Sequence, residues 1–146
     1  MSVGTVCSRE TIICRSDESL AAAAQLMVQS HVGSIVVVDD RGGSVVPIAM
    51  LTDRDIVRGL TRERASLESL TVREVATPHP LIAVESDDVG TVIEAMLGRA
   101  VRRVPVVNAS GALVGILSVD DLVGYFSDQL RNLAQLVATQ VHRERG

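Results

Sequence analysis

The sequence predicts an α/β (α+β) chain in which two copies of one β-α-β-β-α unit, related by a pseudo-twofold axis, precede a C-terminal helix. The first observation is a repeated phrase, LTDRDIV at 51–57 and LSVDDLV at 117–123, in which a hydroxyl residue precedes an aspartate by three positions. The second is that a shift of 69 positions aligns SLAAAAQLM at 19–27 with DVGTVIEAM at 88–96. Similarity within one chain at a fixed period indicates a duplicated structural unit.

Each copy divides into the same elements. Short apolar runs at 11–14 and 81–84 predict a first strand, and the polar stretches SDES and ESDD supply N-caps for a helix of about three turns. Two β-rich runs follow in each copy, joined by the glycine-bearing turns DDRGGS and NASG, which predicts a hairpin. These runs are 34–38 with 45–51 and 103–107 with 112–117. A second helix then begins at the hydroxyl–Asp phrase.

The predicted boundaries are 1–64 for the first copy, 65–126 for a linker and the second copy, and 127–146 for the C-terminal helix. The linker TRERASLESLTVREVATPHP is polar and ends in a segment with two prolines. In the tail, apolar residues recur every three or four positions, which predicts one apolar face on a helix of about 18 residues. They are Phe126, Leu130, Leu133, Val137 and Val141. Two interpretations stay open: the helix packs on its own domain, or it pairs with a second subunit.

The composition excludes several classes of protein. The chain has 146 residues, 47% of them apolar and 22% charged, as expected for a soluble globular protein of about one domain. A net charge of −4 speaks against a general nucleic-acid binder, and one Tyr, one Phe and no Trp speak against base stacking. No membrane-spanning run and no signal peptide are evident. We therefore expect a cytoplasmic protein in which Cys7 and Cys14 are reduced.

The sequence does not favour catalysis. The histidines, at 31, 79 and 142, have no recognisable Ser or Cys partner. Neither CxxC nor HExxH spacing supports a metal site, and neither GxxxxGK[ST] nor GxGxxG is present. We predict a protein that is not an enzyme and has no catalytic cofactor and no metal.

The repeated phrase has two interpretations. Thr52 with Asp55, and Ser118 with Asp121, could each form a capping box at a helix N-terminus. Alternatively, each pair could bind a ligand, because it lies where a buried strand meets a helix. An ionised carboxylate accepts hydrogen bonds and suits the two neighbouring hydroxyls of a ribose, while the helix N–H groups suit a phosphate.

Arginines and aliphatic residues complete the candidate site. Arg102 and Arg103 are adjacent at a strand start and therefore point to opposite faces, and Arg54 lies inside the phrase. A guanidinium fits a phosphate because it can bond two oxygens at once. Since aromatic residues are nearly absent, aliphatic walls would hold a base: Ile13, Ile35, Ile56, Ile82 and Val104.

The ordered set HVGSIVVVDD…MLTDRDIV and AVRRVPVVNASGALVGILSVDDLV resembles a pair of cystathionine-β-synthase (CBS) domains, a Bateman module, over residues 5–126. The resemblance implies a cleft between the repeats that binds an adenosine-containing ligand, AMP or ATP first, with ADP, S-adenosylmethionine and NAD as further candidates. It implies ribose contacts at Thr52, Asp55, Ser118 and Asp121 and phosphate contacts at Arg102 and Arg103. It also implies a disc-like homodimer that regulates a target protein.

The first copy departs from the pattern of the second. Ala49 aligns with Gly115, and Val36 aligns with the strand proline. Gly33 and Ser34 stand where the second copy has its two arginines, so we expect the two clefts to differ. The leading hypothesis is a regulatory nucleotide-binding module whose ribose site at Thr52 and Asp55 receives an arginine from the other copy. The alternative is a structural dimerisation module with vestigial clefts.

Overall fold

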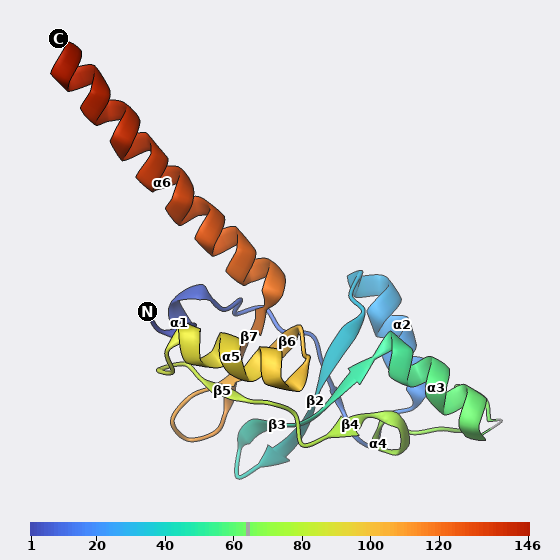
Figure 1. Cartoon of the computed structure of the whole chain (residues 1–146). Helices are drawn as coiled ribbons and strands as arrows, with labels where there is room; N and C mark the ends of the chain where they lie inside the picture. Colours follow the sequence, from blue (N-terminus) through green and yellow to red (C-terminus); the bar gives the residue numbers. More distant parts are fainter. Residues whose placement is uncertain (64) are drawn as a thin grey trace.

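The computed structural model describes residues 1–63 and 65–146 and confirms the predicted α/β fold (Figure 1). Each repeat contributes one sheet with helices packed against it, and the two repeats lie side by side. Each helix–strand unit follows the predicted order, so the duplicated sequence encodes a duplicated structure.

The first repeat is built on a four-stranded sheet in the order β1-β2-β3-β4. Strand β1 pairs in parallel with β2, β2 pairs antiparallel with β3, and β3 pairs antiparallel with β4. The elements are β1 Ile13–Arg15, α2 Leu20–Ser30, β2 Ser34–Arg41, β3 Ser44–Thr52 and α3 Asp53–Glu63, with β4 Thr77–Pro78 joining from the inter-repeat segment. The Ser34 end of β2 therefore lies beside Thr52, at the N-terminus of α3.

The second repeat has a three-stranded sheet in the order β5-β6-β7. Its elements are β5 Ala83–Val84, α5 Val89–Arg99, β6 Arg103–Val107, β7 Leu113–Ser118 and α6 Val119–Arg145. Strand β5 pairs in parallel with β6, and β6 pairs antiparallel with β7. Arg103 faces Ser118 in this register, which is the position that Ser34 has opposite Thr52 in the first repeat.

The helices begin and end in the same way in both repeats. The side chain of Ser19 accepts a hydrogen bond from the Ala22 N–H at 3.1 Å at the start of α2, and Asp88 accepts one from the Thr91 N–H at 3.3 Å at the start of α5. Such caps satisfy amide groups that have no partner inside the helix. Both helices end at a residue with left-handed backbone, His31 and Ala100, each with φ 53°.

Each core contains a short helix that sequence periodicity does not reveal. Helix α4 (Val72–Val75), inside the segment predicted as a linker, places Val72 in the core of the first repeat. Helix α1 (Val3–Val6), inside the segment assigned to the first copy, places Val3 in the core of the second repeat. Four residues are too short for a helical period to show, so only burial identifies these segments.

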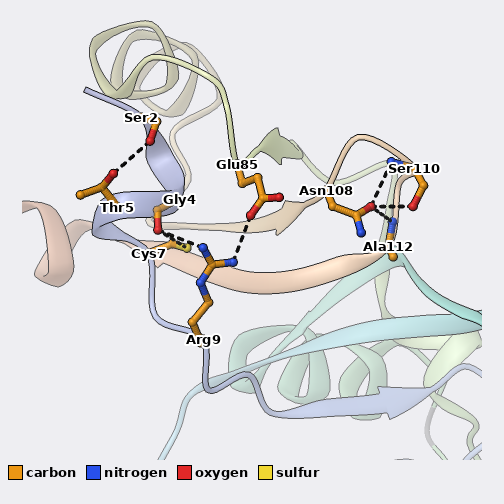
Figure 2. Close-up of polar contacts among 9 residues, drawn as sticks. All are labelled: Ser2, Gly4, Thr5, Cys7, Arg9, Glu85, Asn108, Ser110 and Ala112. Carbon is orange, nitrogen blue, oxygen red and sulfur yellow. Dashed lines mark hydrogen bonds and ion pairs between the residues drawn. The ribbon is translucent and has the colours of Figure 1, made fainter.

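The N-terminal segment is held on the second repeat by polar contacts (Figure 2). Arg9 donates to the Gly4 carbonyl oxygen at 3.1 Å and forms an ion pair with Glu85 at 3.2 Å. In the nearby hairpin, Asn108 Oδ1 accepts from the N–H and hydroxyl of Ser110 and from the Ala112 N–H, which fixes the turn. The first nine residues thus pack against the second repeat.

Helix α6 is one continuous helix of 27 residues. The sequence predicted a separate helix at 127–146, but no proline or turn interrupts the chain after Val119, so the last helix of the second repeat and the tail form a single element. Every residue from Phe126 onward is exposed, and α6 extends away from both sheets (Figure 1). None of the described helices combines the length and hydropathy needed to cross a membrane.

Candidate functional site

Both hydroxyl–Asp pairs form reciprocal hydrogen bonds at the start of a helix. In the first repeat, the Asp55 N–H donates to Thr52 Oγ1 at 3.1 Å, and the Thr52 N–H donates to Asp55 Oδ2 at 2.9 Å. In the second, the Asp121 N–H donates to Ser118 Oγ at 3.0 Å, and the Ser118 N–H donates to Asp121 Oδ2 at 3.1 Å. The capping-box interpretation of the phrase is therefore correct in both copies.

Capping leaves acceptor capacity on each carboxylate. An ionised carboxylate has about four lone-pair sites, and the backbone uses one of them in each pair. The second oxygen of Asp55 receives the Thr77 hydroxyl at 3.4 Å, which is a long contact. Within the described chain, no donor reaches Oδ1 of Asp121. The same side chains can thus cap a helix and accept further hydrogen bonds.

A cavity of about 540 Å³ lies at the boundary between the two repeats. The first repeat contributes Gly33, Ser34, Met50, Thr52, Asp53 and Arg54, and the second contributes Ala100, Val101, Arg102 and Arg103. The C-terminal end of β3 and the N-terminal end of α3 form one wall, and the segment between α5 and β6 forms the other. We name it the cross-repeat cavity.

Three arginines give the cross-repeat cavity an excess of positive charge. Arg54, Arg102 and Arg103 line it, against one carboxylate, Asp53. Arg103 Nη1 donates to Ser34 Oγ at 3.3 Å, so this half-buried side chain bridges the repeats. The Arg102 side chain is 75% exposed and lies 3.9 Å from Asp120, a distance at which the ion pair is weak and the guanidinium is available. The cavity suits an anionic group.

Asp55 does not line the cross-repeat cavity but a smaller one of about 170 Å³, and its reciprocal hydrogen bonds with Thr52 link the two. The other lining residues are Arg58, Gly59, Arg62, Glu74, Val75 and Thr77. Sequence reasoning missed Arg58 and Thr77. Arg58 follows Asp55 by three positions, which places both on one face of α3, so helical spacing could have found it. Thr77 lies in the segment predicted as a linker, where no sequence pattern indicates a contact with Asp55.

The equivalent region of the second repeat has a different charge. Gly33 and Ser34 occupy the positions that match Arg102 and Arg103, and Asp120 accompanies Asp121 in the first turn of α6. Ser8 forms a β-bridge with Ile116 there, with backbone hydrogen bonds of 2.9 Å in both directions. A side chain on Gly115 would overlap the Ser8 carbonyl oxygen. The N-terminal segment therefore pairs with β7 as β4 pairs with β3 in the first repeat, where Ala49 lies opposite Pro78.

The structure separates the aliphatic residues that were expected to hold a base. Ile35 and Val104 are at most 1% exposed and belong to the two hydrophobic cores. Ile13 is half-buried on β1 opposite Val36, and Ile82 is exposed. Met50, Ala100 and Val101 are the apolar residues that line the cross-repeat cavity.

Neither a metal centre nor a reactive thiol is evident in the part of the chain that the structure describes. No group of three or more His, Cys, Asp or Glu side chains gathers among residues 1–63 and 65–146. Burial raises the pKa of the Cys14 thiol to about 12, and burial is also the main cause of the raised pKa of Cys7. Both thiols are therefore protonated, and poor nucleophiles, at neutral pH.

A duplicated β-α-β-β-α unit with a polar cavity at the repeat boundary defines a tandem-domain binding module. The chain belongs to the CBS domain family, whose model matches residues 3–62 and 72–128. The protein MK0525 of Methanopyrus kandleri is 29% identical over 124 residues, which are 84% of this chain and 61% of that protein. The chain thus spans less than two thirds of that relative.

Solved structures share the fold. The CBS domain protein PAE2072 from Pyrobaculum aerophilum, complexed with AMP, has a TM-score of 0.73 and 26% identity over 84% of this chain and 90% of that one. The CBS domain pair of protein MJ0100, in complex with 5-methylthioadenosine and S-adenosyl-L-methionine, has a TM-score of 0.73 and 25% identity, covering 86% of this chain and 99% of that one.

Proposed function

We propose that the protein is a regulatory module that binds an adenosine nucleotide in the cross-repeat cavity. The observation that carries the proposal is that Thr52 and the arginines at 54, 102 and 103 line one cavity at the repeat boundary. A nucleotide offers what these groups recognise, because its ribose donates hydrogen bonds and its phosphate accepts them. The relatives' complexes with AMP and with adenosyl ligands support this class of ligand.

In this proposal the phosphate lies between Arg54, Arg102 and Arg103, and the ribose lies at Thr52 and extends toward Asp55, the hydrogen-bond partner of Thr52 in the smaller cavity. The ligand class is AMP or ATP, because the arginines favour a phosphate over the cationic sulfonium of S-adenosylmethionine. We propose one such nucleotide per chain. The Ser118 and Asp121 side has acidic residues where a phosphate would need cations.

The module acts by changing its own assembly or a partner surface, and not by catalysis. CBS domain pairs are in general regulatory, and the described residues form no recognisable catalytic group. We propose a homodimer that buries exposed apolar residues of its helices, among them Leu97 of α5 and Val123 of α6. Ligand binding shifts its equilibrium through a differential affinity for two arrangements. The target protein and the cytoplasmic location remain predictions.

Titration calorimetry of the full chain with AMP, ATP, S-adenosylmethionine and NAD tests the proposal. We expect one site per chain for AMP or ATP. Asp55→Ala should weaken binding. The control is Asp39→Ala, which should leave binding unchanged, because Asp39 is a half-buried aspartate near the turn between β2 and β3. Unchanged affinity of Asp55→Ala would remove the ribose role from this carboxylate.

The alternative function is a structural dimerisation module with vestigial clefts. The engagement of both carboxylates by their own backbone amides favours it. The two functions differ in one outcome of the calorimetry. An absence of heat and of thermal stabilisation with all four ligands would reject the regulatory module and leave the structural one.

A further inference from the structure

Helix α6 carries a continuous row of exposed apolar side chains, which we name the α6 stripe. It consists of Val123, Phe126, Leu130, Leu133, Val137 and Val141, and Leu136 lies at its edge. These side chains are between 42% and 66% exposed. Their spacing of three or four residues is that of a helix–helix contact surface.

From Phe126 onward, α6 gains little burial from the rest of the described chain. All residues from Phe126 to Gly146 are exposed, and helices in water gain most of their stability from packing an apolar face. A contiguous apolar surface of this kind marks an interaction site. The helix therefore needs a partner.

The stripe continues into an apolar groove between α5 and α6. The groove measures about 670 Å³, and Val123, Phe126 and Leu130 of the stripe line it together with Ile93, Met96 and Leu97 of α5. Leu97 is 81% exposed. A helix lying along the stripe would thus contact both α5 and α6 near residues 123–130, and α6 alone beyond Leu130.

The charge distribution along α6 favours a second copy of the helix in the opposite direction. The first turn of α6 carries Asp120 and Asp121, whereas the last turn carries His142, Arg143 and Arg145 against one acid, Glu144; between them, Asp128 is paired with Arg131. A second α6 in the opposite direction brings basic ends to acidic ends and pairs opposite helix dipoles. A parallel pair would bring like charges together.

We propose that the α6 stripe and the groove are occupied by α6 of a second copy of this chain, in antiparallel orientation. The inference rests on the homodimer proposed above and specifies its contact surface. In the symmetric arrangement Phe126 lies opposite Val141 of the other copy, and Leu130 lies opposite Val137. A twofold axis passes near Leu133, so that each helix end enters the groove of the other copy.

The apolar area that such a pair would bury reaches the size of a small specific interface at the upper end of its range. Burial of an aliphatic side chain removes roughly 60–120 Å² from water, from about 25 cal/mol per Å² and 1.5–3 kcal/mol per side chain. The stripe, Leu136 and Leu97 are on average a little over half exposed. Two copies together would then bury roughly 600–1,200 Å² of apolar surface, around the lower bound of about 1,000 Å² for a specific interface.

Light scattering of the full chain tests the contact surface. Leu130→Glu with Leu133→Glu should halve the particle mass, because four carboxylates would face an apolar seam. Asn132→Glu with Gln135→Glu adds the same charge on the outer face of α6 and should keep the wild-type mass. A wild-type monomer, or an unchanged mass of the stripe variant, would overturn the inference. Nucleotide binding by the stripe variant, measured in parallel, reports on the cross-repeat cavity separately.

Disulfide cross-linking tests the orientation. Phe126→Cys and Val141→Cys, each alone, should cross-link no more than the parent chain, whose Cys7 and Cys14 supply the background. An equimolar mixture of the two variants should give a cross-linked dimer. Cross-linking of either variant with itself, or no cross-link in the mixture, would contradict the antiparallel pair.

Discussion

The carbonyl oxygen of Arg102 accepts a hydrogen bond of 2.9 Å from the backbone N–H of Val119, the first residue of α6. The side chain of Arg102 lies 3.9 Å from Asp120, the second residue of α6. The segment Ala100–Val101–Arg102 lines both the cross-repeat cavity and the groove beside α6. A ligand that moves this segment would therefore act on the start of α6, through one hydrogen bond and one ion pair.

The first prediction concerns competition for Arg102. Asp120→Asn should raise the affinity for AMP by about 1.5-fold to five-fold, because Arg102 would no longer have to give up an exposed ion pair, worth about 0.2–1 kcal/mol, when it binds the phosphate. Titration calorimetry at low salt measures it. Asp128→Asn, which removes a carboxylate of the same helix that pairs with Arg131, is the control and should not change the affinity. A weaker affinity of Asp120→Asn would mean that Asp120 itself supports the ligand.

The second prediction concerns the phosphate. Arg103→Ala should weaken AMP binding about ten-fold or more, because hydrogen bonds to charged groups contribute about 1.5–3 kcal/mol, and should leave the affinity for adenosine nearly unchanged. Arg41→Ala, at the hairpin end of β2, is a matched arginine control. Equal losses for AMP and adenosine would show that Arg103 acts through its bridge to Ser34 and not on the phosphate.

The duplication made most of the fold predictable from the sequence, because hairpin turns, N-caps and apolar runs recur at matching positions. The strands β2, β3, β6 and β7 fall close to their predicted ranges. Helices α1 and α4 were not predicted because four residues are too few to show a helical period. The sequence was divided into two helices where α6 is one, because the apolar spacing of the tail did not show that it continues the last helix of the second repeat. Thr52, Arg102 and Arg103 were identified as candidates by residue type, whereas the cavity that joins them depends on packing between repeats.

Gly115 illustrates this limit. In the sequence, the contrast between Gly115 and Ala49 suggested a difference in ligand access. In the structure, the space beside Gly115 is filled by the backbone of Ser8, which pairs with the adjacent residue Ile116. A contact between residues more than a hundred positions apart leaves no local pattern in a single sequence.

The third prediction follows from that contact. Gly115→Ala should lower the free energy of unfolding by about 1–3 kcal/mol, the usual cost of overpacking, because the new methyl group would overlap the Ser8 carbonyl oxygen. Urea denaturation measures it. Gly124→Ala on α6 meets no atom within 4 Å and should stabilise the protein by about 0.5–1 kcal/mol. Equal stability of Gly115→Ala and the wild type would show that the N-terminal segment does not need this close approach.

The fourth prediction concerns the thiols and pH. At pH 8 a thiol with a pKa of about 12 is ionised in about one molecule in ten thousand, so a disulfide reagent should label Cys14 only after unfolding, while Cys7, half-buried, should react first. Because the folded state holds the Cys14 proton more tightly than the unfolded state does, the free energy of unfolding should fall as the pH rises from about 9 to about 12. Cys14→Ala should abolish both the slow labelling phase and this part of the pH dependence. Two rapidly reacting thiols in the folded protein would contradict the burial of Cys14 in the core of the first repeat.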